Sequence, residues 1–101
     1  MEIHGNDFGI KCRDGTTTDD IVEVVKQFWS DAVLELDESG DFFIYPNENA
    51  KINWDEEGWS EENDTTMILV MPNSKDGKIW FTIDDNNVNM PIIDAIQKEL
   101  K

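Results

Sequence analysis

Two apolar runs in the second half of the chain constrain the fold more than any other feature of the sequence. The first, Thr66–Met71, is apolar at nearly every position, which is typical of a strand buried on both faces. The second, Lys78–Ile83, follows after six residues that contain Asp76-Gly77, a pair suited to a tight turn. Because so short a connection cannot cross over a sheet, the two strands are expected to be antiparallel. We therefore expect the core to be built on an antiparallel sheet with residues 66–71 near its centre.

Three more short segments have the pattern of strands. In residues 8–12 every second side chain is apolar, which indicates a half-buried strand. Residues 33–37 and 41–45 are two further strand candidates, separated by a short turn that ends in Gly40. Two such runs joined by a glycine-containing turn predict a β-hairpin.

Two segments have the apolar period of a helix. Thr17 or Thr18 is expected to cap the first, which should end near Ser30-Asp31. Its apolar stripe consists of Ile21, Val24, Val25, Phe28 and Trp29. Asn89 is expected to cap the second, with Pro91 in its first turn, where the missing N–H costs nothing. Its apolar stripe consists of Ile92, Ile93, Ile96 and Leu100.

These elements follow each other in the order β-α-β-β-β-β-α. This order predicts an α+β fold, with an antiparallel sheet of about five strands and two helices packed on one face. The length of 101 residues fits a single domain that covers residues 1–101. Residues 46–65 then form one long acidic connection that contains two tryptophans. Connections of this length exceed the usual loop and tend to be functional or disordered.

The net charge argues against two classes of partner. The chain has 8 Lys and Arg residues against 23 Asp and Glu residues, a formal net charge of −15. A protein of this charge is repelled by nucleic acid and by anionic membrane surfaces. We expect a cytoplasmic protein, because residues 1–7 lack the basic start of a signal peptide and no apolar stretch approaches the roughly 20 residues of a membrane span. Cys12 is the only cysteine, so the chain has no internal disulfide and no cysteine-based zinc site.

The acidic residues are concentrated in the middle of the chain. Residues 27–74 contain 12 acidic residues and one base, Lys51. The densest part, residues 46–65, combines seven acidic residues with Trp54 and Trp59. One interpretation is that the two indoles fold back as a lid over the second face of the sheet. The other is that at least one indole is an exposed binding anchor surrounded by carboxylates, since tryptophan is enriched at interface hot spots and charge steers association.

Crowded carboxylates repel each other, and a cationic partner would relieve that repulsion. The charge therefore favours a basic protein as partner. The candidate partner-binding residues are Trp54, Asp55, Glu56, Glu57, Trp59, Glu61, Glu62 and Asp64. The second face of the sheet, which would carry Phe43, Tyr45 and Trp80, could instead support a homodimer.

We expect no catalytic residues, cofactor or specific metal site. The only histidine, His4, lies near the start of the chain, and the sequence has no G-x-S-x-G motif and no glycine-rich phosphate loop. Residues 53–64 can be aligned with an EF-hand loop. The alignment puts Asn53 at position 1, where Asp is usual, and Asp64 at position 12, where a long bidentate Glu is needed.

The segment Trp54-Asp55-Glu56-Glu57-Gly58-Trp59, set in a short αβ frame, resembles the small immunity proteins of contact-dependent inhibition and polymorphic toxin systems in bacteria. The resemblance implies a cytoplasmic toxin inhibitor that binds a basic nuclease domain, with acidic side chains imitating phosphates. Two alternatives remain. The chain could be a nucleic-acid mimic that inhibits a DNA-binding effector, or an accessory interaction domain of another role.

Overall fold

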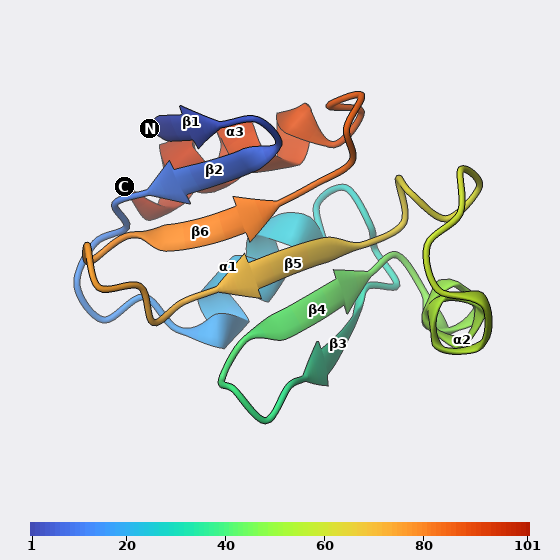
Figure 1. Ribbon diagram of the computed structural model, residues 1–101. Helices are drawn as coiled ribbons and strands as arrows, with labels where there is room; N and C mark the ends of the chain where they lie inside the picture. Colours follow the sequence, from blue (N-terminus) through green and yellow to red (C-terminus); the bar gives the residue numbers. More distant parts are fainter.

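A six-stranded antiparallel sheet forms the centre of the computed structural model, which describes residues 1–101 (Figure 1). Its spatial order is β1-β2-β6-β5-β4-β3. The strands are β1 (Glu2–His4), β2 (Asp7–Ile10), β3 (Val33–Leu36), β4 (Phe42–Tyr45), β5 (Ile68–Met71) and β6 (Ile79–Thr82). The prediction of an antiparallel sheet in an α+β fold is confirmed, and β5 and β6 are neighbours near its centre.

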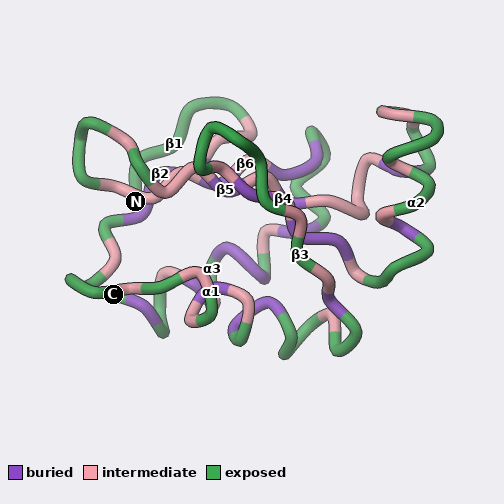
Figure 2. Tube along the Cα trace, turned by 90° about the horizontal axis from the view of Figure 1, so that it is seen from below, coloured by how far each residue is buried: buried purple, intermediate pink, exposed green.

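Three helices accompany the sheet: α1 (Thr18–Val25), α2 (Glu48–Glu57) and α3 (Met90–Leu100). Figure 2 shows α1 and α3 on the same side of the sheet, whereas α2 stands beyond one end of it. Helix α2 contacts β4. The chain therefore runs ββα three times. The predicted order β-α-β-β-β-β-α, with about five strands and two helices, is wrong because it lacks β1 and α2.

Strand β1 was missed because it has no apolar alternation. All three of its residues are exposed, and even Ile3 is 56% exposed. The strand is held by its antiparallel pairing with β2. Gly5, at φ +62°, provides the left-handed conformation that the turn between the two strands requires.

Helix α2 was missed for a similar reason. Ala50 is its only buried residue, so no apolar stripe marks it. The signals that were present are the caps. Asn47 Oδ1 accepts a hydrogen bond from the Ala50 amide at 2.8 Å, and Gly58 ends the helix at φ +68°. Half of the predicted connection 46–65 is therefore a capped helix and not a loop.

Helix α1 begins as predicted but ends earlier. Thr17 caps it in a capping box with Asp20. It ends at Val25 instead of near Ser30-Asp31. Beyond it the chain tightens into a turn, in which the amides of Gln27 and Phe28 bond to carbonyls three residues back. The last two positions of the predicted stripe consequently leave the helix: Phe28 is exposed and Trp29 packs only partly against the core.

Helix α3 was predicted with the correct stripe, since Ile92, Ile93, Ile96 and Leu100 are all buried. The predicted cap position is also correct, but the capping hydrogen bond is missing. Asn89 occupies the N-cap position but makes no capping hydrogen bond, and its side-chain amide donates to Thr65 O at 2.8 Å.

The core lies between the sheet and the α1–α3 layer. A row of side chains in register, Phe8, Phe81, Val70 and Phe42, crosses four strands and is fully buried. In β5, Ile68 and Val70 are fully buried, whereas Leu69 and Met71 are half-buried. The prediction that this strand is buried on both faces is therefore only half right, because no helix lies over the second face.

Candidate partner-binding site

The second face of the sheet, which we call the open face, carries half-buried side chains that cover one another. Trp80 lies between Gly9 and Met71 in the strand register. The Trp80 ring covers Gly9 so closely that a Cβ atom there would lie 2.6 Å from Cζ2 of the indole. Leu69 and Phe43 continue the apolar surface towards β3.

Trp80 is fixed at one end of this face. Its indole N–H donates to Asp76 Oδ2 at 3.0 Å, and the ring of His4 lies 5.6 Å from it, centroid to centroid. Hydrogen bonds from the Ser74 hydroxyl, the Lys78 amide and the Trp80 indole lower the pKa of Asp76 to about 2. Trp80 is therefore held in place by these partners and packs over Gly9, which is a structural role. Tyr45, the other expected aromatic of this face besides Phe43, is buried and donates to Glu35 Oε1.

The eight predicted binding residues fall into two groups. Trp54, Asp55, Glu56 and Glu57 belong to α2, and Trp59, Glu61, Glu62 and Asp64 belong to the turn that follows it. Within α2, Asp55 forms an ion pair with Lys51 Nζ at 3.2 Å, and Lys51 also meets Glu35 Oε2 at 3.3 Å. The hydrogen bonds to these two carboxylates raise the pKa of Lys51. Asp55 is therefore already partly neutralised, whereas Glu56 and Glu57 are exposed and form no ion pair.

The two tryptophans have different environments. Trp54 is half-buried, and its indole N–H donates to Thr66 Oγ1 at 2.9 Å. Trp59 is 64% exposed, and its indole N–H donates to Asp64 Oδ1 at 3.0 Å. The burial of Trp54 therefore favours the lid interpretation for that indole. The exposure of Trp59 favours the interpretation as an exposed anchor.

The turn after α2 is held by its own hydrogen bonds. The buried Asn63 donates from its side chain to Gly58 O at 3.0 Å, and its amide donates to Ser60 O. Thr66 Oγ1 donates to Asn63 O at 2.7 Å. These bonds fix the backbone between the helix and β5, so Trp59 is displayed from an ordered segment.

Trp54 and Trp59 line a groove at the end of the open face. It has a volume of about 200 Å³. Its lining residues are Asn6, Trp54, Trp59, Asp64, Met67, Thr82, Ile83 and Asp85. A second hollow of about 420 Å³ adjoins it and is lined by Trp59, Glu61, Asp64, Asp85 and Asn86.

Asp85 is the functional candidate that the sequence did not single out. It follows β6 in a segment predicted only as a polar loop, and sheet pairing brings that segment beside the β1–β2 turn. Asn6 of that turn donates to Asp85 Oδ1 at 3.1 Å. The adjacent buried Asp84 accepts hydrogen bonds from the Val88 and Asn89 amides and so fixes the loop.

The carboxylates around the groove lack cationic partners. The four ion pairs of the structure use only Glu2, Glu35 and Asp55 as acids. Glu61, Asp64 and Asp85 take part in none of them. No group of three or more His, Cys, Asp or Glu side chains is arranged to hold a metal ion.

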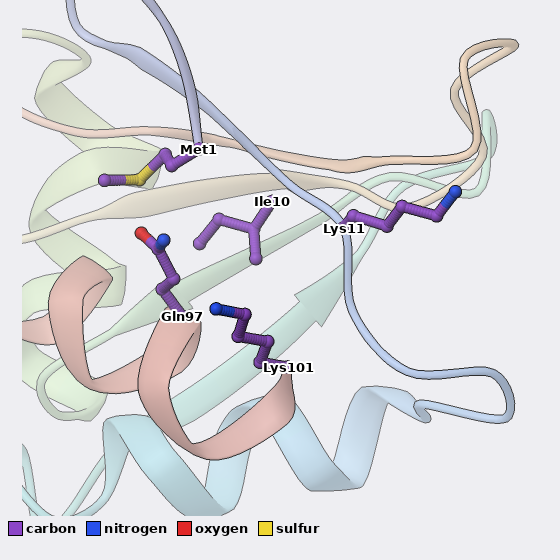
Figure 3. Close-up of a pocket in the computed structure, with 5 residues that line it drawn as sticks. All are labelled: Met1, Ile10, Lys11, Gln97 and Lys101. Carbon is purple, nitrogen blue, oxygen red and sulfur yellow. The ribbon is translucent and has the colours of Figure 1, made fainter.

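The cations lie mainly at the opposite end of the molecule. Six of the eight basic residues belong to the end of β2, the β5–β6 turn and the end of α3, which lie together near both termini in Figure 1: Lys11, Arg13, Lys75, Lys78, Lys98 and Lys101. A cavity of about 140 Å³ lies at this end (Figure 3). Lys101 extends towards it and Lys11 extends away from it. Acidic side chains lie at this end too, among them Glu2, Asp76 and Glu99, and the acidic β3–β4 turn meets the β5–β6 turn there. The two ends therefore differ mainly in their cations, which are few around α2 and the groove.

No protein family model, curated protein or solved structure matches the chain. None of the helices combines the length and the apolar character needed to cross a membrane.

Proposed function

We propose that this chain is a non-catalytic, acidic binding protein of the cytoplasm that neutralises a basic protein, and that it acts as an immunity protein against a toxic nuclease. The observation that carries the proposal is the exposed indole of Trp59, held by Asp64 beside carboxylates that have no cation. An exposed tryptophan fixed in one orientation is a low-entropy anchor for a protein interface.

The scarcity of cations around α2 supports a basic partner. Most basic residues lie away from α2, so the carboxylates of that end are offset least by neighbouring cations, and their field would orient a basic protein towards it during encounter. Nuclease domains must bind nucleic acid and therefore present cationic surfaces that fit such a field.

The ordered turn after α2 supports tight binding. Asn63 and Thr66 hold the backbone of this segment in place through hydrogen bonds within the chain. A partner would therefore meet a preformed surface and lose little free energy in ordering it.

The test begins with capture from the native host. The purified chain is immobilised and exposed to host lysate at low and at high salt, next to a Trp59→Ala variant as matched control. We expect a basic protein that is retained at low salt, is released at high salt and binds the variant less. That protein should arrest growth when it is expressed alone in a bacterial host, and co-expression of this chain should restore growth.

Two results would overturn the proposal. One is capture of a partner whose binding is unchanged by salt and by Trp59→Ala. The other is a captured basic protein whose toxicity or nuclease activity persists at saturating amounts of this chain.

A further inference from the structure

We infer that the groove between Trp54, Trp59 and the end of β6 receives an arginine side chain of the partner. This rests on the proposed function, because it names the group by which the basic partner is recognised. The groove volume is about 200 Å³. Pockets that take drug-sized ligands are larger, about 300–1,000 Å³. The size therefore suits one side chain.

The walls of the groove fit the stem and the flat face of arginine. Trp54, Trp59, Met67 and Ile83 provide apolar lining. The methylene groups of arginine bury well against such surfaces, and its guanidinium plane stacks on aromatic rings. A cation over an indole face gains about 0.5–2 kcal/mol, depending on how far it is desolvated.

The polar lining of the groove is complementary in charge. Asp64 and Asp85 both line it, and each uses Oδ1 within the chain, to accept from Trp59 Nε1 and Asn6 Nδ2 respectively. The second carboxylate oxygen of each has no hydrogen bond within the chain and no cationic neighbour. A guanidinium carries five N–H donors in a fixed plane and can serve two carboxylates at once.

Other occupants fit less well. A lysine ammonium is a compact, strongly hydrated charge that gains less from stacking between indoles. A second copy of this chain would bring another net charge of −15 against these carboxylates. The lining carboxylates likewise oppose an anion.

The groove is formed before any ligand binds. Trp54 is anchored to Thr66, and Asn6 bridges from its side-chain amide to Ile83 O at 2.8 Å as well as to Asp85. The lining segments come from α2, the turn after it, the end of β6 and the β1–β2 turn, and the pairing of β2 with β6 holds the last two side by side.

The test uses the full chain labelled with ¹⁵N and N-acetyl-arginine amide as probe. The four tryptophans give four indole N–H signals, of which Trp29 and Trp80 lie outside the groove and serve as internal controls. We expect the probe to shift the Trp54 and Trp59 signals and to leave the other two unchanged. N-acetyl-citrulline amide, which has nearly the same shape without the charge, should cause no shift, and N-acetyl-lysine amide should bind at least threefold more weakly.

Variants of matched charge make the test specific. Asp64→Asn and Asp85→Asn should each weaken binding of the arginine probe about fivefold. Both keep an acceptor oxygen for the hydrogen bond within the chain, so the fold is expected to persist, as the dispersion of the indole signals will show. Asp94→Asn removes the same charge from an exposed position of α3 outside the groove and should leave the affinity unchanged.

The outcomes separate the groove from the proposed function. Equal affinity for the lysine probe, or an equal loss of affinity in Asp94→Asn, would overturn the groove in favour of general charge attraction. If the partner is captured but Asp85→Asn binds it as tightly as the wild type, the groove is wrong and the function stands. If the arginine probe binds as expected but no basic partner is captured, the groove stands and the function is wrong.

Discussion

Replacing Trp59 with alanine should weaken partner binding while hardly changing the stability of the fold. A fully buried Phe or Trp replaced by Ala costs about 3–5 kcal/mol of unfolding free energy. Trp59 is 64% exposed, and its indole N–H bonds only to Asp64 on the same turn. We therefore expect Trp59→Ala to lower the unfolding free energy by about 1 kcal/mol.

Trp54 provides the internal comparison. It is half-buried and bonds to Thr66, so Trp54→Ala should cost about 2–3 kcal/mol of unfolding free energy. In binding the order should reverse. An interface anchor is worth about 2 kcal/mol or more, so Trp59→Ala should weaken the partner affinity about thirtyfold.

Urea unfolding followed by far-ultraviolet circular dichroism measures stability without relying on the tryptophans themselves. Calorimetric titration with the captured partner measures affinity. If Trp59→Ala destabilises the chain as much as Trp54→Ala does, or leaves the partner affinity intact, the indole is a structural lid and the anchor reasoning is refuted.

Four further predictions concern the frame of the site. Gly9→Ala should destabilise the chain by about 2 kcal/mol in urea unfolding, because the new Cβ meets the Trp80 ring at 2.6 Å. Asn47→Ala should cost about 1 kcal/mol and reduce the helical circular dichroism signal, since it removes the cap bond to the Ala50 amide. The pKa of Asp76 is lowered from its ordinary value of 3.8 to about 2, so the ionised carboxylate stabilises the fold above pH 3.8 and this stabilisation is lost as the pH falls towards 2. Asp76→Asn should therefore make the unfolding free energy less dependent on pH in this range, as unfolding measured at a series of pH values will show. The association rate with the partner should fall as salt is added in stopped-flow measurements, and a flat rate would contradict electrostatic steering.

The extent to which the sequence predicted this structure depended on periodicity. Helix α3 buries one face, which leaves an apolar period, and strands β5 and β6 are marked by continuous apolar runs. Strand β1 and helix α2 bury almost nothing, so no period marks them. Strand β1 is held by hydrogen bonds to β2, and the start of α2 by the Asn47 cap. Neither kind of hydrogen bond leaves a pattern of apolar residues in the sequence.

The sequence alone indicated only one segment of the candidate site, residues 54–64. Trp59 and Asp64 lie five residues apart, and their proximity follows from the turn between them. Asp85 and Asn6 reach the same groove through the antiparallel register of β2 and β6, a contact between positions far apart in the chain. A single sequence contains no record of that register, so these two residues could not be found.

Solubility alone does not account for the way in which the charges are arranged. A chain that needed only to stay dissolved could disperse its acidic and basic residues, which avoids repulsion within the fold. Here Lys51 is the one cation of α2 and the turn after it, and it is already paired with Glu35 and Asp55. Asp64 and Asp85 both line the groove, and neither forms an ion pair within the chain. A cationic group bound there would relieve the repulsion between acidic side chains. We therefore regard the groove beside Trp59, rather than the total charge, as the feature that a partner recognises.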